Sequence, residues 1–177
     1  LLEGAGQVLP GMGEGSSQKA QNYLDKLGVQ VWLNTMVKDY DGFEIDTGKK
    51  PMFSKTLIWA AGVQCKQMHG IPSDHLARGN RIKVDRFSRV EGFAGLHAIG
   101  DLAFMETPLF PKGMPQVAQP AIQQGKALAK NLSRMVKGKD MQEFEYNDPG
   151  TMATIGRTRA VVEIGKFKSQ GAFAWLI

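Results

Sequence analysis

Two apolar runs that do not alternate with polar residues constrain the fold of this chain more than any other feature. They are TLIWAAG at residues 56–62 and LHAIGD at residues 96–101. A strand that is apolar along its whole length is buried on both faces, which is typical of a parallel sheet covered by helices. The first run ends in small residues and the second stops at Gly-Asp. We therefore predict an α/β fold in which both runs are buried strands.

The remaining chain supplies the helices and shorter strands that such a fold needs. Helices are predicted at 16–28, where Ser16 or Ser17 can serve as the cap, and at about 116–136. Further strands are predicted at 29–33, in a hairpin that turns at Asp41-Gly42, at 81–85, and in a pair after residue 150 that turns near Gly156-Arg157. Glycine and proline interrupt residues 63–80, and we place a boundary between two lobes there.

Composition and charge narrow the class of protein and its partners. Hydrophobic residues make up 42% and charged residues 22% of the 177 residues, as in an ordinary soluble globular protein. No apolar run approaches the roughly 18 residues that a membrane span needs. The net charge is +5, but the basic residues are scattered, which favours a solvated surface. An anionic membrane surface is the next most natural partner. Nucleic acid is not expected, because no basic stretch is interleaved with aromatic residues.

The chain has a single cysteine, Cys65. One cysteine excludes an internal disulfide, a metal cluster built on thiolates and a redox dithiol within these 177 residues. A reducing, cytoplasmic setting fits this usage, and we predict no metal site.

The glycine-rich segment EGAGQVLPGMGEG, residues 3–15, does not have the dinucleotide-binding spacing G-x-G-x-x-G. The third glycine position is Leu9 when the count starts at Gly4, and Ser16 when it starts at Gly11. We therefore interpret the segment as a surface loop. The chain begins with Leu1 rather than methionine, and we expect it to be a piece of a longer protein.

The LHAIGD run ends in a candidate binding residue. Ligands of parallel α/β sheets lie at the carboxyl ends of the strands, where Asp101 could accept hydrogen bonds from sugar hydroxyls and Gly100 would leave room for them. A role for Asp101 as a helix or turn cap fits the spacing equally well. His97 lies within the apolar run and is expected to be a packed imidazole rather than a ligand.

The segment GMPQVAQPAIQQG, residues 113–125, is unusually rich in glutamine. Gln119 and Gln123 are four residues apart, so a helix would place both amides on one face. Its N-terminus would also offer free backbone N–H groups and a positive dipole end to an electron-rich carbonyl or a negatively charged ring. Taken alone, Gln116, Gln119, Gln123 and Gln124 are better interpreted as polar surface, and it is the Gly-Asp turn eighteen residues earlier that favours a site.

Three stretches together resemble the C-terminal half of type II NADH dehydrogenases. They are LHAIGDLA, GMPQVAQPAIQQGKALAKNL and YNDPGTMATIGRTRAVVE, while LLEGAGQVLPG and LIWAAGV resemble the second half of the NADH lobe of that family. These enzymes are single-subunit, FAD-containing NADH:quinone oxidoreductases. The resemblance implies an incomplete two-dinucleotide-binding-domain, Rossmann-like fold followed by the start of a C-terminal β-containing domain. The corresponding parts would be a partial NADH lobe at 1–64, a partial FAD lobe at 65–140 and a membrane-associating domain from 141 to 177.

The resemblance also implies roles for residues of the FAD lobe. Gly100 and Asp101 would bind the ribityl chain of FAD. Ala118 and Gln119 would offer backbone N–H groups to the pyrimidine side of the flavin ring, a placement that favours negative charge on the ring. Gln119 and Gln123 would line the quinone site.

Three further residues would contact NADH. Glu3 would bind the adenosine ribose, and Ala61 and Gly62 would lie against the nicotinamide. The implied reaction passes a hydride from NADH to FAD and electrons on to a membrane quinone. No acidic, basic or nucleophilic side chain is needed as a catalyst, since the flavin supplies the chemistry.

The same resemblance places the protein at the cytoplasmic face of a membrane as a peripheral protein. Both glycine loops of the family would lie upstream of this chain and its membrane-binding helices downstream, so we expect the isolated fragment to be inactive. Since half-lobes would expose apolar edges, a homo-oligomer is expected. Two alternatives remain: another FAD- and NAD(P)-dependent pyridine nucleotide oxidoreductase, or a non-catalytic α/β binding module. The single Cys65 disfavours the relatives whose cysteine pairs would fall in this half.

Overall fold

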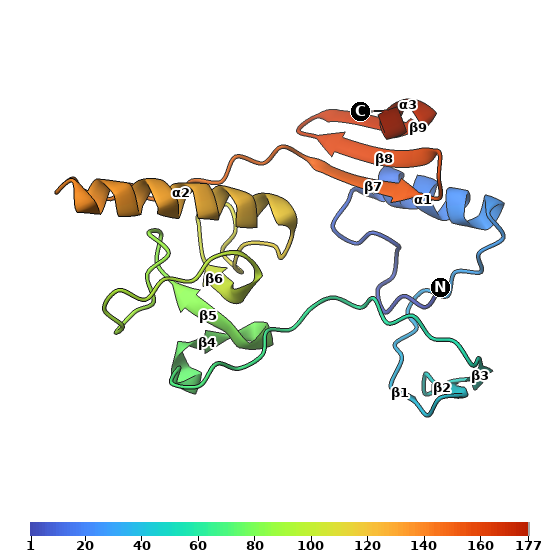
Figure 1. Cartoon of the computed structure of the whole chain (residues 1–177). Helices are drawn as coiled ribbons and strands as arrows, with labels where there is room; N and C mark the ends of the chain where they lie inside the picture. Colours follow the sequence, from blue (N-terminus) through green and yellow to red (C-terminus); the bar gives the residue numbers. More distant parts are fainter. Residues whose placement is uncertain (177) are drawn as a thin grey trace. The chain divides into compact units, whose positions relative to one another are not determined.

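The computed structural model describes residues 1–176, and these residues form two compact units (Figure 1). The first unit contains Leu1–Trp59 together with the segment that begins at Pro149, and the second contains Ala60–Asp148. These units are defined by packing and do not identify which nucleotide a lobe binds. The division into parts at 1–64, 65–140 and 141–177 therefore stays a prediction.

The first unit is built on an antiparallel sheet between two helices. Its three strands lie in the order β7-β8-β9, and residues 156–158 turn between the first two with Gly156 at φ 68°. The predicted pair of strands after residue 150 is confirmed, and the third strand was not predicted. The bounds are Thr151–Ile155 for β7, Arg159–Ile164 for β8, Phe167–Gly171 for β9, Glu14–Lys26 for helix α1 and Ala172–Leu176 for helix α3.

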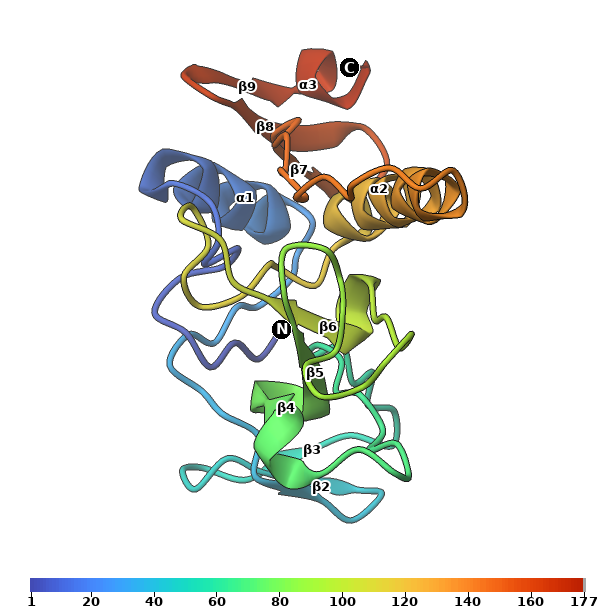
Figure 2. The ribbon, with the colours of Figure 1, turned by 90° about the vertical axis from the view of Figure 1, so that its left-hand side faces the viewer.

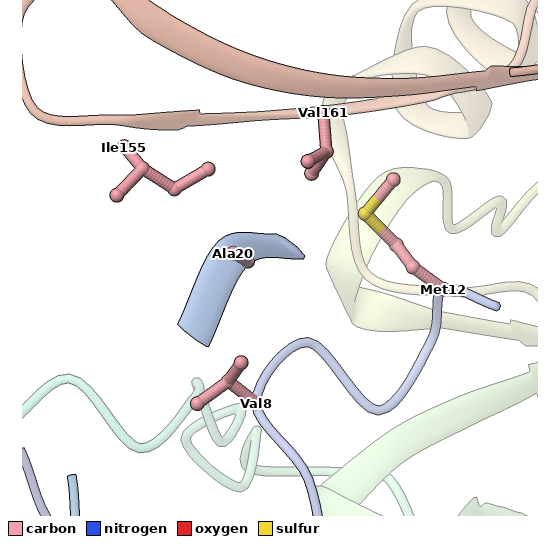
Figure 3. Close-up of a cluster of buried hydrophobic side chains, with 5 residues drawn as sticks. All are labelled: Val8, Met12, Ala20, Ile155 and Val161. Carbon is pink, nitrogen blue, oxygen red and sulfur yellow. The ribbon is translucent and has the colours of Figure 1, made fainter. Parts of the chain in front are cut away.

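Alternation along β8 divides the apolar residues of this sheet between its two faces. Val161 packs on the α1 side, in a cluster with Val8, Met12, Ala20 and Ile155 (Figure 3). The flanking residues Ala160 and Val162 point the other way and are buried with Ala174 of α3. Successive side chains of a strand face opposite sides, so one run of small apolar residues serves both helices. Figure 2 shows α1 and α3 on opposite faces of the sheet.

A second small sheet of this unit forms where the hairpin was predicted. Strands β1 (Asp39–Tyr40), β2 (Glu44–Asp46) and β3 (Met52–Phe53) pair antiparallel in that order. Asp41 Oδ1 accepts the backbone N–H groups of Phe43 and Glu44 at 2.8 and 2.7 Å, which closes the turn and holds the pKa of Asp41 below its usual value. The predicted turn at Asp41-Gly42 is confirmed.

Helix α1 begins two residues before the predicted helix, and the expected serine cap is wrong. Ser17 Oγ donates to Val8 O at 2.6 Å, and Ser16 Oγ donates to Glu163 Oε1 at 2.6 Å. The Glu163 carboxylate comes from β8 and also accepts the backbone N–H of Gly13, with both oxygens at 3.2 Å. A carboxylate at a helix N-terminus satisfies its unpaired donors and opposes its positive dipole end. A residue 150 positions away therefore replaces the local cap.

The environment of Glu163 predicts a pH-dependent contribution to stability. The Ser16 hydroxyl, the Gly13 N–H and Lys168 together lower the pKa of Glu163. A carboxyl whose pKa is lowered by folding stabilises the protein above its unfolded pKa and loses that contribution as the pH falls through its folded pKa. Glu163→Gln in the full-length protein should lower the free energy of unfolding by about 1 kcal/mol at pH 7, as the loss of a helix cap does.

Thermal unfolding measured between pH 7 and pH 3 tests this prediction. The melting temperatures of wild type and Glu163→Gln should converge as the pH falls through the lowered pKa of Glu163, because the wild-type carboxyl then also becomes protonated. The exposed Glu106 provides a matched control, and Glu106→Gln should melt with wild type at pH 7. A difference for Glu163→Gln that stays constant over the whole range would contradict the prediction.

The second unit combines a small mixed sheet with the long helix α2 (Ala118–Val136). Strand β5 pairs antiparallel with β4 and parallel with β6, with Ile82 opposite Ala103. The predicted strand at 81–85 and the predicted helix at 116–136 are confirmed. The bounds of the shorter elements are Leu76–Ala77 for β4, Arg81–Val84 for β5, Ala103–Met105 for β6, and Ser73–His75, Arg78–Asn80 and Gly100–Leu102 for the 3-10 helices η1, η2 and η3.

Neither of the two apolar runs forms the predicted strand. Residues 56–62 have no strand or bridge partner among residues 1–176, and Ile58 is 86% exposed. In the other run, His97 makes only an isolated bridge with Arg89, and Gly100 turns the chain into η3 at φ 66°. A strand forms only where its backbone hydrogen-bonds to a neighbouring strand, and it is buried on both faces only where other layers cover both sides of that sheet. Without such neighbours these residues form no strand in the described part of the chain.

The predicted strand at 29–33 is also wrong. It is reduced to one parallel bridge between Trp32 and Leu2. The backbone still pairs at this point, since Glu3 N donates to Trp32 O and Trp32 N donates to Leu1 O, both at 2.9 Å.

Candidate functional site

The Gly100–Asp101 turn lies directly against the first turns of α2. A Cβ built on Gly100 would be 3.2 Å from Ala121 Cβ, and the positive φ of Gly100 disfavours any other residue. Asp101 O accepts a hydrogen bond from Gln116 Nε2 at 3.2 Å and one from Cys65 Sγ at 3.3 Å. The Asp101 side chain is exposed. The backbone of this residue is thus held from several sides while its carboxylate faces solvent.

A buried arginine that the sequence did not reveal binds the backbone that follows this turn. Arg81 is 7% exposed, and its guanidinium donates to Ala103 O at 3.1 and 2.5 Å and to Met114 O at 2.9 Å. Burial lowers the pKa of Arg81, while electrostatic interactions with Cys65 and Asp101 oppose that shift. Arginine remains charged at any physiological pH. The fold therefore holds a buried positive charge that interacts electrostatically with Asp101.

The N-terminus of α2 has the free donors that the sequence predicts. Val117 is the N-cap residue and its side chain makes no capping hydrogen bond. Ala118 and Gln119 follow as exposed residues, and Pro120 occupies the third helical position. The first N–H groups of a helix have no acceptor within it, and a proline in this turn removes one that would be unused. The site therefore offers backbone N–H groups beside Asp101 in a helix of 19 residues.

The glutamines of α2 have different environments, although they share a pattern in the sequence. Gln119 is exposed, as predicted for a surface amide. Gln123 is partly buried, and its amide donates to Asn147 O at 2.8 Å and accepts from Asn147 N at 3.1 Å. Gln124 is 1% exposed, so its interpretation as polar surface is wrong. Gln119 and Gln123 both lie on α2, four residues apart. The oxygen and the nitrogen of the Gln123 amide are both already hydrogen-bonded to the backbone of Asn147.

The segment 140–148 runs back along α2 with no strand partner among residues 1–176 (Figure 2). Phe144 N donates to the backbone carbonyl of Arg86 at 2.7 Å, and side chains supply further hydrogen bonds to the backbone of the segment. The contacts are Asn131 with both backbone groups of Gln142, Arg86 with Phe144 O, Gln123 with both backbone groups of Asn147, and Arg134 with Asp140 O. Backbone groups need hydrogen-bond partners, and here side chains of α2 together with Arg86 provide them.

The predicted NADH residues are divided between the two units. Glu3 belongs to the first unit, is partly buried, and accepts the Ala5 N–H with Oε1 at 2.8 Å. Ala61 and Gly62 belong to the second unit and are exposed, with Gly62 at φ 97°. One oxygen of the Glu3 carboxylate is thereby fixed by the backbone, and the orientation of the other follows from it.

Other features of the second unit complete the description of possible sites. His97 is packed as predicted, and its Nε2 is buried with no hydrogen-bond partner within residues 1–176. A pocket of about 520 Å³ lies where α2 meets the 140–148 segment and includes Gln123, Lys126 and Lys130. Within the described part of the chain, no three His, Cys, Asp or Glu side chains gather as metal ligands, and no helix is long and apolar enough to cross a membrane.

Comparisons with known proteins agree with the predicted fold and resemblance. Residues 1–125 match the family described as pyridine nucleotide-disulphide oxidoreductase. The chain is 37% identical to the type II NADH:quinone oxidoreductase NdhA of Mycobacterium tuberculosis, over 99% of this chain and 39% of the relative. It is 31% identical to the type II NADH:quinone oxidoreductase of Staphylococcus aureus, over 88% of this chain and 39% of the relative. The chain thus spans about two fifths of the length of these curated relatives.

Solved structures extend the comparison of the fold. NDH2 from Plasmodium falciparum in complex with NADH superposes with a TM-score of 0.83 at 18% identity, covering 98% of this chain and 52% of that chain. The sulfide:quinone oxidoreductase of Aquifex aeolicus superposes with a TM-score of 0.68 at 14% identity, covering 98% and 45%. Together with the family match, these superpositions confirm the predicted α/β dinucleotide-binding fold in partial form.

Proposed function

Because this chain belongs to the pyridine nucleotide-disulphide oxidoreductase family, we propose that it is part of an FAD-dependent NADH:quinone oxidoreductase. One observation carries the proposal. The similarity to proteins named type II NADH:quinone oxidoreductase covers 99% of this chain at 37% identity, and it includes the Gly100–Asp101 turn and the N-terminus of α2. Those two elements lie in contact in the second unit.

The residues around this contact are chemically suited to FAD. Gly100 cannot carry a Cβ without displacing Ala121, so the turn is built for close approach. The exposed Asp101 carboxylate would accept hydrogen bonds from the ribityl hydroxyls. The backbone N–H groups of Ala118 and Gln119 would donate to the pyrimidine side of the ring. Arg81 adds a buried positive charge that interacts with Asp101, and positive charge in this region favours a ring that gains negative charge.

The chemistry divides between the cofactor and the chain. Bound FAD supplies the capacity to accept a hydride and to pass on two electrons. Asp101, Ala118 and Gln119 orient the ring, and the positive environment stabilises the charge that reduction brings. We assign Glu3, Ala61 and Gly62 to NADH, and Gln119 and Gln123 to the quinone side. Since the Gln123 amide is held by Asn147, Gln123 would contribute a fixed wall, and the exposed Gln119 would contribute the adaptable contact.

The partners of the longer protein follow from this assignment. A quinone dissolved in a bilayer requires the enzyme to meet the membrane surface, so we propose a peripheral protein at the cytoplasmic face. The net charge of +5 supports contact with anionic lipid. We also propose a homo-oligomer, which would cover apolar surface of the kind exposed on α2.

Anaerobic spectroscopy of the full-length protein tests the proposed function. The purified protein should be yellow, lose its flavin absorbance on addition of NADH and regain it on addition of a soluble quinone. A colourless protein would contradict the assignment as a flavoenzyme. A yellow protein that NADH bleaches but quinone does not restore would instead support another pyridine nucleotide oxidoreductase.

Glu3 should determine the preference for NADH over NADPH. A carboxylate that accepts hydrogen bonds from the adenosine ribose repels a 2′-phosphate. Glu3→Gln in the full-length enzyme should therefore raise the ratio of kcat/KM for NADPH to that for NADH, by about tenfold for about 1.4 kcal/mol. Steady-state kinetics with both nucleotides measure this ratio. The exposed Glu14→Gln is a matched control, and an unchanged ratio for Glu3→Gln would remove Glu3 from the site.

Gln119 and Gln123 should affect the two half-reactions differently. Losing a hydrogen bond from Gln119 to the quinone costs on the order of 1 kcal/mol, which is several-fold in rate, and truncating Gln123 removes the fixed wall that Asn147 holds. Gln119→Ala or Gln123→Ala should slow flavin reoxidation by quinone more than flavin reduction by NADH. Stopped-flow absorbance resolves the two steps, and the exposed Gln67→Ala serves as the control. Equal slowing of both half-reactions would argue against this placement.

A further inference from the structure

Gln124 is a buried amide with a specific acceptor role. It lies on the inward face of α2 with Pro120 and Asn131, and it is 1% exposed. Its Oε1 accepts the backbone N–H of Gly100 at 2.7 Å, and its Nε2 lies 3.9 Å from Met105 Sδ. A buried amide is costly unless it is hydrogen-bonded, so the strong bond to Gly100 defines the position of this side chain.

The Gly100 N–H needs this partner because of where it lies in the backbone. Gly100 is the first residue of η3, and the first N–H groups of a helix have no acceptor within it. Gly100 packs closely against Ala121, so the turn that contains Gly100 lies against α2. Gln124, one turn further along the same helix, supplies the missing acceptor.

The consequence of this bond falls on the next residue, Asp101. Its carbonyl is held by Gln116 and Cys65, and the N–H of the residue before it is held by Gln124. These bonds set the position of the Asp101 carboxylate relative to the N-terminal turn of α2. Those are the two elements that the proposed function assigns to the flavin, whereas Gln124 itself is buried beneath them.

We propose that Gln124 is a positioning residue, which fixes Asp101 against the N-terminus of α2 and thereby sets the affinity of the site for FAD. This inference rests on the proposed function for its ligand, but its structural part concerns only residues of this chain. The acceptor oxygen is the essential group, because the amide nitrogen faces a thioether that is a weak acceptor.

Two substitutions separate the acceptor from the volume of the side chain. Gln124→Met keeps the length and burial but removes the acceptor. Gln124→Glu keeps an acceptor oxygen and matches the amide in shape when it is protonated. Asn131→Met is the matched control, because Asn131 is also buried on α2 but bonds to Gln142 rather than to Gly100.

The first measurement is the dissociation constant for FAD, from fluorescence titration of the flavin-free full-length protein. We expect Gln124→Met to raise it about tenfold, and Asn131→Met to leave it within about threefold of wild type. Gln124→Glu should bind FAD more tightly at pH 5.5 than at pH 8, since burial raises the pKa of the new carboxyl and its ionised form is costly there. Wild type should lack this pH dependence between the same limits.

The second measurement needs no flavin. Hydrogen exchange of the Gly100 amide in the flavin-free protein should be at least about tenfold faster in Gln124→Met than in Asn131→Met. Unchanged exchange at Gly100 would overturn the positioning role. Equal loss of FAD affinity in Gln124→Met and Asn131→Met would also overturn it, because that result describes general destabilisation. A wild-type protein that binds no FAD would refute the proposed function, and the exchange experiment would still test the contact.

Discussion

The purified 177-residue chain is expected to be colourless and inactive with NADH and quinone. FAD of this fold class is held largely by a G-x-G-x-x-G loop and a helix N-terminus at its pyrophosphate, and these 177 residues contain no such spacing. Asp101 and the first turn of α2 would contact only the ribityl chain and one edge of the ring. Several missing charge-assisted hydrogen bonds, at about 1.5–3 kcal/mol each, would weaken FAD binding by several orders of magnitude.

The same chain should self-associate. The outer face of α2 exposes Ile122, Leu132 and Val136, and the 56–62 run exposes Ile58 and Trp59. Exposed apolar side chains of this size favour association with a second copy. Absorbance at the flavin bands and light scattering of the purified chain test both expectations, with the full-length protein as the reference. A monomeric chain that retains stoichiometric FAD would overturn this account.

The largest effect of a single substitution on stability is expected at Arg81. Arg81→Met would fill a similar volume, but it would leave Ala103 O and Met114 O without the guanidinium donor in a buried site. Each unsatisfied buried carbonyl costs about 1–3 kcal/mol, so the loss should be on the order of 3 kcal/mol. Arg81→Lys should recover part of it, because an ammonium can donate but cannot reproduce the planar fork.

Urea unfolding of the full-length protein measures this difference. Arg89→Met is the matched control, since Arg89 is exposed and pairs with Asp85 four residues away at 2.7 Å. Exposed pairs of this kind contribute at most about 1 kcal/mol. If Arg81→Met unfolds at the same urea concentration as Arg89→Met, the guanidinium contacts do not stabilise the second unit.

The elements predicted correctly from the sequence carry their determinants within a few residues. The turn at Asp41 is closed by its own carboxylate, and the turn at Gly156 by a positive φ that glycine adopts freely. Helix α2 has helical spacing over five turns and a proline where the first turn tolerates it. The strand predictions for the two apolar runs were wrong because their determinants are distant in the sequence. A buried strand depends on neighbouring strands, and neither run finds them in the described part of the chain.

The candidate site shows the same division between local and distant causes. The sequence placed Asp101 and the glutamine-rich helix in one site, and the structure brings Gly100 into contact with Ala121 and Gln124. It could not distinguish the buried Gln124 from the exposed Gln119, because burial depends on what packs against the helix. Arg81 was read as one residue of a strand, and nothing near it in the sequence indicates that its partners lie more than twenty residues away.

The attachment of residues 140–148 has a consequence for how this region can change in evolution. The segment is held through its backbone, by hydrogen bonds from the side chains of Asn131, Arg86 and Gln123. Most replacements of the exposed Gln142 and Asn147 side chains would therefore leave the attachment intact. Proline is the exception, because both positions donate a backbone N–H to α2. Homologues should therefore drift freely in the identity of these two residues and avoid proline there. Asn131 and Gln123, the residues of α2 whose side chains bind this backbone, should change far more slowly.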